Sequence, residues 1–102
     1  MQETLVPLLE ALASDKRLLV LDWLRDPKEH FPPQTYGDLV RDGVCGVSIA
    51  EKLGISPSTA SRHMKQLTGV GLVRAKRIRQ WTFYRRDENA IKKMKDIMRR
   101  SL

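Results

Sequence analysis

The sequence predicts a mainly α-helical α+β fold in one domain, residues 1–102, with a small β-hairpin as its β-structure. Five segments place apolar residues at helical spacing, and two short segments within residues 72–86 are rich in β-branched and aromatic residues. A proline- and glycine-rich stretch, residues 26–46, divides the helical segments into two groups. An apolar content of 41% is enough for one modest hydrophobic core.

Two helices are predicted before the proline- and glycine-rich stretch. Residues 3–14 place an apolar stripe at positions i, i+3, i+4 and i+7 of a helix, formed by Leu5, Leu8, Leu9 and Leu12. Ser14 suits the N-cap of a second helix over residues 15–25. This second segment is apolar nearly all round, which predicts a central, buried helix.

Residues 26–46 are predicted to form a long loop, with one helical turn near residues 38–41. A loop of this length in a small domain is typically functional or mobile, so it is where we would look for an effector site. It contains Cys45, the single cysteine of the chain, which excludes an internal disulfide and suits a reducing compartment. A redox-sensing thiol and an inert, half-buried thiol are both compatible with this cysteine.

The strongest local signals follow the loop. Ser48 and Glu51 have the spacing of an N-terminal capping box, and Gly54 can adopt the positive φ that ends a short helix. Ser56 then caps a second helix, in which Pro57 occupies the first position. Two short helices joined through a glycine turn form a helix-turn-helix.

The second helix of this unit, which spans residues 47–69 in all, separates apolar from polar side chains. The apolar residues expected to face the core are Ala60, Met64 and Leu67. The polar residues left on the outer side are Ser58, Thr59, Ser61, Arg62, Lys65 and Gln66. The start of such a helix can donate backbone N–H groups and hydroxyls to phosphate, and Arg62 is long enough to reach a guanine edge. An ordinary helical hairpin with a polar outer face is the alternative.

Residues 72–77 (LVRAKR) and 81–86 (WTFYRR) are predicted to pair as a β-hairpin. The turn between them lacks the Gly or Asn that favours a two-residue connection, so we expect a longer or looser turn. A basic hairpin that directly follows a recognition helix is a wing, which reaches phosphates or the minor groove. Trp81 and Phe83 are expected to fix the hairpin to the core rather than stack on single-stranded nucleic acid. The polar residues of the wing tip are Arg77, Arg79 and Gln80.

The last predicted helix spans residues 87–101, with Asp87 as its N-cap and a further apolar stripe. One small core does not obviously cover both this stripe and the stripe of the first helix. Packing both stripes against a second copy of the chain creates a two-fold dimer, and packing within one chain is the alternative. The expected interface consists of Leu5, Leu8, Leu9, Leu12, Ile91, Met94, Ile97 and Met98.

Charge is distributed unevenly along the chain. Residues 1–60 contain six Lys/Arg and nine Asp/Glu, whereas residues 61–102 contain thirteen Lys/Arg and three Asp/Glu, a net charge of +10. A solvated basic surface would explain the overall net charge of +7, but so uneven a distribution favours a polyanionic partner.

The order of two helices, helix-turn-helix, hairpin and terminal helix resembles the ArsR/SmtB family of bacterial repressors. The resemblance is specific in the segment AEKLGISPSTASRHMKQLTGVGLV and in WTFY, which is similar to the aromatic strand after the wing of that family. It implies a dimer through the first and last helices, and DNA contacts from the helix that begins at Ser56 and from the wing. The contacts expected from the residues and the resemblance together are Ser56, Ser58, Thr59, Ser61, Arg62, His63, Lys65, Arg77, Arg79 and Gln80.

The sequence departs from the metal-sensing members that it resembles. Their Cys-Val-Cys motif corresponds here to residues 45–47, Cys-Gly-Val, and the last helix contains no histidine. We therefore expect no metal and no cofactor, because zinc or a thiophilic ion needs three or four ligands in a small volume. A site that combines His30 and Cys45 with Glu29 or Asp42 is the alternative.

The function predicted from the sequence is sequence-specific binding of double-stranded DNA by a homodimeric transcriptional repressor. An unknown signal would release it, and a small-molecule or redox effector stays open. A winged-helix module for protein association is the alternative, although it would favour a less polar recognition surface than residues 58–65 provide. No nucleophile–base set or phosphate-binding glycine loop points to an enzyme. The N-terminus lacks the pattern of a signal peptide and the longest apolar run, residues 18–21, is too short for a bilayer, so we expect a cytoplasmic, nucleoid-associated protein without membrane contact.

Overall fold

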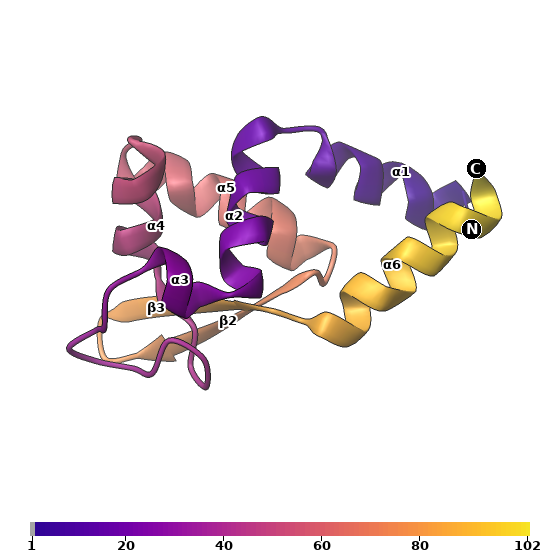
Figure 1. The fold of residues 1–102 in the computed structure, drawn as a ribbon. Helices are drawn as coiled ribbons and strands as arrows, with labels where there is room; N and C mark the ends of the chain where they lie inside the picture. Colours follow the sequence, from indigo (N-terminus) through magenta and orange to yellow (C-terminus); the bar gives the residue numbers. More distant parts are fainter. Residues whose placement is uncertain (1) are drawn as a thin grey trace.

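The structure is a computed structural model that describes residues 2–102, with side chains from residue 4 onward. It is elongated, with principal extents of 42 × 25 × 23 Å, and the first and last helices meet at one end (Figure 1). The elements in chain order are α1 (Gln2–Leu12), α2 (Asp15–Arg25), α3 (Pro27–His30), β1 (Val44–Cys45), α4 (Gly46–Leu53), α5 (Pro57–Gly69), β2 (Val73–Ile78), β3 (Trp81–Arg86) and α6 (Glu88–Ser101).

The hydrophobic core lies between the sheet and the helices α2, α4 and α5, which cover one of its faces (Figure 1). Its centre is formed by side chains with almost no exposed surface: Val20, Val44, Ile49, Met64, Leu67 and Leu72. The predicted inward side of α5 is confirmed, because Ala60, Met64 and Leu67 are all buried. The predicted burial of the central helix α2 holds on one side only, because Val20, Leu21 and Leu24 are buried whereas Leu18 and Leu19 are 51% and 46% exposed.

The β-structure is a three-stranded antiparallel sheet in the order β1-β3-β2, and not the hairpin alone. The two residues of β1 pair with Phe83 and Tyr84 of β3, so the end of the long loop joins the sheet edge. In the hairpin, Ile78 pairs with Trp81, which leaves a two-residue turn. The expectation of a longer turn is wrong because Arg79 itself adopts the left-handed conformation, with φ +56°, that Gly or Asn would usually supply.

Most helix ends follow the local signals in the sequence. The side chains of Ser14, Ser56 and Asp87 accept hydrogen bonds from backbone N–H groups three residues later, as predicted for N-caps. Gly54 ends α4 with φ +70°, also as predicted. The capping box at Ser48 is wrong, because α4 begins at residue 46, directly after β1, and its N-cap residue makes no side-chain cap.

The segment between α3 and β1, residues 31–43, contacts both faces of the sheet: Phe31 and Leu39 belong to the core cluster, whereas Gly37 and Asp42 contact Phe83 and Lys76 on the opposite face. Successive strand residues point to opposite faces, so Phe83 points away from the core side occupied by Tyr84. Gly37 packs so closely on Phe83 that a Cβ added there would lie 2.8 Å from the ring. The predicted turn near residues 38–41 is present, with the Asp42 N–H donating to the Asp38 carbonyl at 2.8 Å. Helix α3 lies inside the predicted loop and was not anticipated.

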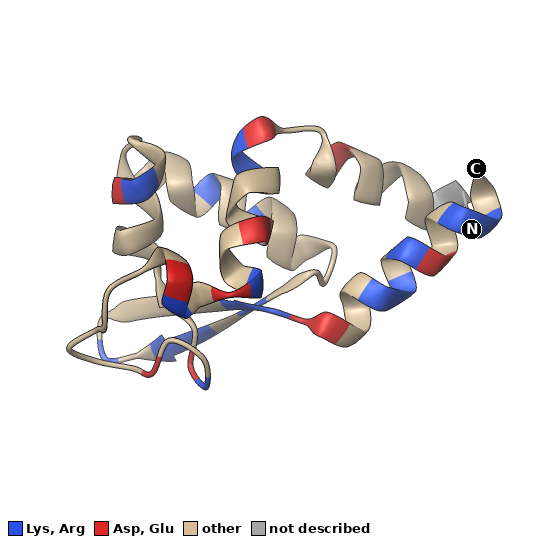
Figure 2. Cartoon of the chain, in the orientation of Figure 1, with Lys and Arg blue, Asp and Glu red and all other residues tan. Residues whose placement is uncertain are grey.

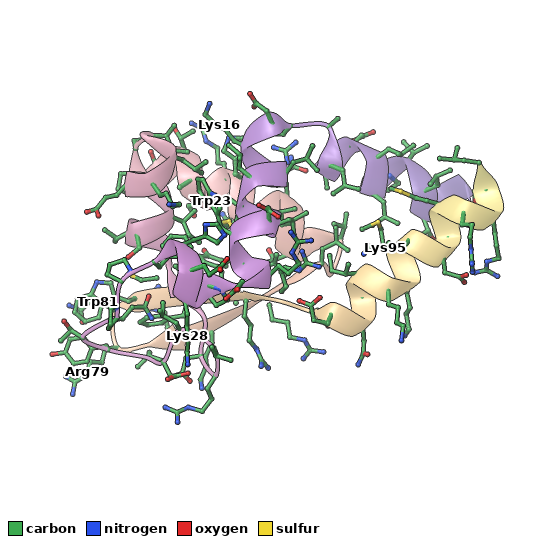
Figure 3. The ribbon with its side chains drawn as sticks, viewed as in Figure 1. Lys16, Trp23, Lys28, Arg79, Trp81 and Lys95 are labelled. Atoms are coloured by element: carbon green, nitrogen blue, oxygen red, sulfur yellow. The ribbon has the colours of Figure 1, made fainter. Side chains whose placement is uncertain are left out.

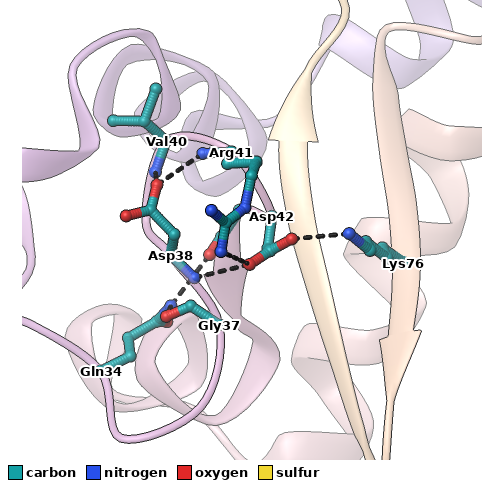
Figure 4. A network of polar contacts seen from close by, with 8 residues as sticks. Gln34, Gly37, Asp38, Val40, Arg41, Asp42 and Lys76 are labelled. Carbon is teal, nitrogen blue, oxygen red and sulfur yellow. Dashed lines mark hydrogen bonds and ion pairs between the residues drawn. The ribbon is translucent and has the colours of Figure 1, made fainter.

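Asp42 fixes the end of this segment to the sheet (Figure 4). The residue is 4% exposed. Its carboxylate accepts hydrogen bonds from the Lys76 Nζ at 2.6 Å and from the Asp38 N–H at 2.7 Å. The Lys76 ammonium, followed by the backbone hydrogen bond, lowers the pKa of Asp42 from 3.8 to about 2. The ionised form of Asp42 is therefore the form that the folded state favours, and it stabilises the contact between residues 31–43 and the sheet.

Stability should depend on pH through Asp42. Because its folded pKa lies below the unfolded value, the carboxylate stabilises the fold above about pH 4, and this contribution is lost as pH falls from about 4 towards 2. Chemical denaturation of wild type and Asp42→Asn across this range measures the effect. The variant should be less stable at pH 7, and the difference should shrink on acidification; a constant difference would contradict the assignment.

Gly43→Ala should destabilise the fold by at least about 1–3 kcal/mol. Gly43 has φ +112°, and an added Cβ would lie 2.5 Å from the backbone oxygen of Tyr84, which cannot move without disturbing the sheet. Gly69→Ala is the matched control, because nothing lies within 4 Å of its added Cβ. Urea denaturation should show a loss for the first variant and none for the second.

Candidate nucleic-acid interface

Helix α5 begins with a cluster of hydroxyl groups. The Ser56 Oγ accepts from the Thr59 N–H at 3.2 Å, lies 3.2 Å from the Ser58 Oγ and donates to the Thr59 Oγ1 at 2.9 Å. Pro57 occupies the first helical position, where an N–H would have no helical partner. The N-terminus of a helix attracts anions through its free N–H groups, so this end of α5 can bind a phosphate together with its hydroxyls.

The outer face of α5 is polar and exposed. Burial of the three inward residues leaves Ser58, Ser61, Arg62, Lys65 and Gln66 exposed along the opposite side. Among the residues that the structure describes, no carboxylate forms an ion pair with Arg62 or Lys65. Both cations are therefore available to an external partner.

His63 lies apart from the other predicted contacts of α5. It is partly buried, and its Nδ1 accepts from the Arg17 Nη1 at 2.8 Å, because a guanidinium can only donate. The same guanidinium donates to the Ala11 carbonyl at 2.6 Å and to the Glu10 carbonyl at 3.1 Å. Burial, and then the positive charges of Arg17 and Lys16, lower the pKa of His63 and favour its neutral form. The structure thus places His63 between α5 and the junction of α1 with α2.

The wing tip is held by contacts within the chain. The Arg77 guanidinium donates to the Arg79 carbonyl at 3.2 Å and to the Thr82 hydroxyl at 3.4 Å. The Arg79 guanidinium lies 4.9 Å from the ring centre of Tyr36, and Gln80 is exposed. Figure 3 shows Arg79 and Trp81 together at the end of the molecule that is farthest from α6.

Of the three aromatic residues of β3, Trp81 and Phe83 lie on the sheet face away from Tyr84, and both contact other parts of the chain. Phe83 is 1% exposed and packs against Gly37, so its predicted burial is confirmed, although its ring lies on the sheet face away from the central core cluster. Trp81 is half-buried and stacks on Tyr36, with ring centres 4.9 Å apart and ring planes at 23°. It therefore fixes the hairpin to the loop segment and not to the central core.

Basic residues gather along the hairpin and α6 (Figure 2). Several are neutralised locally: Arg74 pairs with Asp87 at 2.9 Å, and Arg99 and Arg100 both pair with Asp96. Within the described residues, Arg62 and Lys65 on the outer face of α5 form no such pair, and they share this with several other cations of the hairpin and of α6.

Sequence reasoning missed two residues that shape this interface, Arg17 and Tyr36. Arg17 is one of several charged residues in a helical segment, and its partners lie six, seven and forty-six positions away. Tyr36 lies in a segment without periodicity, and its two partners come from the wing. A local pattern could have found neither of them.

The side chains of the alternative metal site, His30, Cys45, Glu29 and Asp42, do not gather in the structure. Within the described part of the chain, no group of three or more His, Cys, Asp or Glu side chains is placed to hold a metal ion. Cys45 is free and partly exposed, beside an open hollow of about 380 Å³ formed by the loop segment, α4 and β3. No helix in residues 2–102 combines the length and apolar character needed to cross a membrane.

Comparisons with known proteins agree with this geometry. Residues 47–75 match the family described as a helix-turn-helix domain. The chain is 39% identical over 94 residues to the uncharacterized HTH-type transcriptional regulator YbzH of Bacillus subtilis, covering 92% of this chain and 94% of that protein. It is 30% identical to the nodulation protein NolR of Rhizobium meliloti, over 84% of this chain and 58% of that longer protein.

Solved structures share the fold. The crystal structure of NolR from Sinorhizobium fredii matches with a TM-score of 0.62 and 27% identity, covering 94% of this chain and 82% of that chain. HlyU from Vibrio cholerae matches with a TM-score of 0.65 and 25% identity, covering 97% and 91%. These likenesses, with the helix-turn-helix, the wing and the close relative in Bacillus subtilis, show that the chain belongs to the ArsR/SmtB family of winged helix-turn-helix transcriptional regulators.

Proposed function

We propose that the chain is a homodimeric repressor that binds a specific double-stranded DNA site through α5 and the wing. The observation that supports this proposal best is the outer face of α5. It combines a capped, hydroxyl-rich N-terminus with Arg62 and Lys65, which no carboxylate of the described residues neutralises. Because neither side chain has to break an ion pair within the protein, both can bind phosphates or base edges of DNA without that energetic cost.

The residues of α5 divide between two kinds of contact. Ser56 and Thr59 lie at the helix start, where hydroxyls and N–H groups can fix a phosphate and set the register of the helix in the major groove. Arg62 lies one turn further along the outward face, and its guanidinium fits the two acceptors of a guanine edge. Arg77, Arg79 and Gln80 of the wing would then contact the backbone or the minor groove beside the site.

A dimer through α1 and α6 would place two such surfaces on one duplex. These helices project from one end of the molecule (Figure 1), and their outer sides keep exposed or partly exposed apolar residues, including Val6, Leu9 and Ile97. Four other members of the expected interface, Leu5, Leu8, Ile91 and Met94, are already buried within one chain. The proposed interface therefore depends mainly on the remaining members: Leu9, Leu12, Ile97 and Met98. Two-fold packing suits a DNA site with half-sites about 34 Å apart.

DNA binding should depend on Arg62. The wild-type chain should bind a duplex selected from a random pool at least about 10³-fold more tightly than a scrambled duplex. Arg62→Ala should weaken this binding by about 1–3 kcal/mol and reduce the preference at one base pair. Arg25→Ala, which removes an exposed arginine of α2 that pairs with Asp22, is the control for net charge.

Fluorescence anisotropy at several salt concentrations measures both variants. Equal losses for Arg62→Ala and Arg25→Ala would mean that charge alone matters, and would contradict base reading by Arg62. Failure of the wild-type chain to select any duplex would contradict DNA binding itself and favour a protein-association module.

Dimerisation should depend on the outer side of α1. Leu9 is 40% exposed in one chain, and a buried charge without a partner strongly disfavours an interface, so Leu9→Glu should shift sedimentation equilibrium towards monomer. Val40→Glu, on a residue that is 54% exposed in the loop segment, should leave the association unchanged. A Leu9→Glu dimer as stable as wild type would exclude α1 from the interface.

A further inference from the structure

Three side chains stack at the wing tip, and we name them the wing-tip stack: Tyr36, Trp81 and Arg79. The Tyr36 and Trp81 rings lie 4.9 Å apart at 23°, and the Arg79 guanidinium carbon lies 4.9 Å from the centre of the Tyr36 ring. Tyr36 comes from the segment between α3 and β1, whereas Trp81 and Arg79 come from the wing. The stack therefore joins two parts of the chain that are more than forty residues apart.

The loop segment holds Tyr36 in place through contacts on both sides of it. On one side, the Gln34 amide donates to the Gly43 carbonyl at 3.0 Å and accepts from the Cys45 N–H at 2.7 Å. On the other side, Gly37 adopts φ +79° and packs directly on the Phe83 ring. The Tyr36 ring is therefore presented to the wing by a fixed backbone, although 39% of the residue is exposed.

Two properties of Arg79 accompany the stack. Its backbone has φ +56°, an unfavourable conformation for a residue with a side chain, which persists only where surrounding contacts select it. A guanidinium that stacks on an aromatic ring keeps its N–H donors at the edge of its plane, free for a phosphate or a base. Within residues 4–102, no side-chain hydrogen bond or ion pair engages those donors.

We propose that Tyr36 is a positioning residue for the DNA contact of the wing: with Trp81 it forms a platform that orients the Arg79 guanidinium towards the DNA backbone. This inference rests on the proposed function, and it extends the DNA interface to a residue outside the 47–75 region that matches the helix-turn-helix family. Tyr36 itself does not touch DNA in this arrangement. Its effect passes entirely through Arg79.

A double-mutant cycle tests this dependence, because two residues that act through one contact give non-additive losses. Wild type, Tyr36→Ala, Arg79→Ala and the double variant are titrated as full chains by anisotropy, with the duplex that wild type selects from a random pool. We expect Tyr36→Ala to weaken binding about threefold to fivefold and Arg79→Ala about tenfold. The double variant should bind no more weakly than Arg79→Ala alone.

Two conservative variants separate positioning from a merely structural role. Tyr36→Phe keeps the ring and should restore wild-type affinity within about twofold. Arg79→Lys keeps the charge but not the planar stacking, so Tyr36→Ala should have no further effect in its background. Thr35→Ala, at the neighbouring exposed position, is the matched control for the loop and should bind as wild type does.

The outcomes are distinct. Additive losses in the cycle would show that Tyr36 acts by stabilising the loop and would overturn the inference. Tighter binding by Tyr36→Ala would show that the stack withholds Arg79 from DNA, which also overturns it. Absence of duplex selection by wild type would instead overturn the proposed function, whatever the variants do. Should Tyr36→Ala prove unfolded by thermal melting, the Arg79→Lys comparison is made with Tyr36→Leu.

Discussion

The orientation of α5 depends on one packing constraint, the burial of Ala60, Met64 and Leu67 against α2 and the sheet. Because the three residues lie on one side of the helix, α5 cannot rotate about its axis without exposing them or opening a void. Every polar residue on the opposite side is thereby aimed outward. Three buried apolar residues that would not contact DNA themselves thus determine the direction in which Arg62 points.

Arg17 adds a polar contact to this packing. Its guanidinium joins the last carbonyl groups of α1, the start of α2 and the imidazole of His63 on α5. Helix C-termini leave carbonyls without helical partners, so a cation there is favourable and the carbonyls at the end of α1 are satisfied. A single side chain thus links the terminal helix that we propose for dimerisation to the helix that we propose for DNA reading.

Features that depend on residues three or four positions apart could be predicted from the sequence. Features that depend on contacts between distant parts of the chain could not. Caps at Ser14, Ser56 and Asp87 are local, since donor and acceptor are three residues apart, and all three are present. Strand β1 has only two residues and exists because they pair with β3 about forty residues later, so no local pattern indicates it. The early start of α4 follows from that strand, and the roles of Arg17 and Tyr36 likewise depend on distant partners.

The elongated shape has a mechanical consequence. The wing tip lies at the opposite end of the 42 Å long axis from α1 and α6 (Figure 1). In a dimer joined through those helices, each subunit would extend from the interface along its full length. A rigid-body rotation of about a few degrees at the interface would then displace the wing tip by about several ångströms. That displacement is comparable to the rise of one base pair. A small change at the dimer interface could therefore move α5 and the wing of both subunits out of register with the two half-sites, while each subunit keeps its own fold.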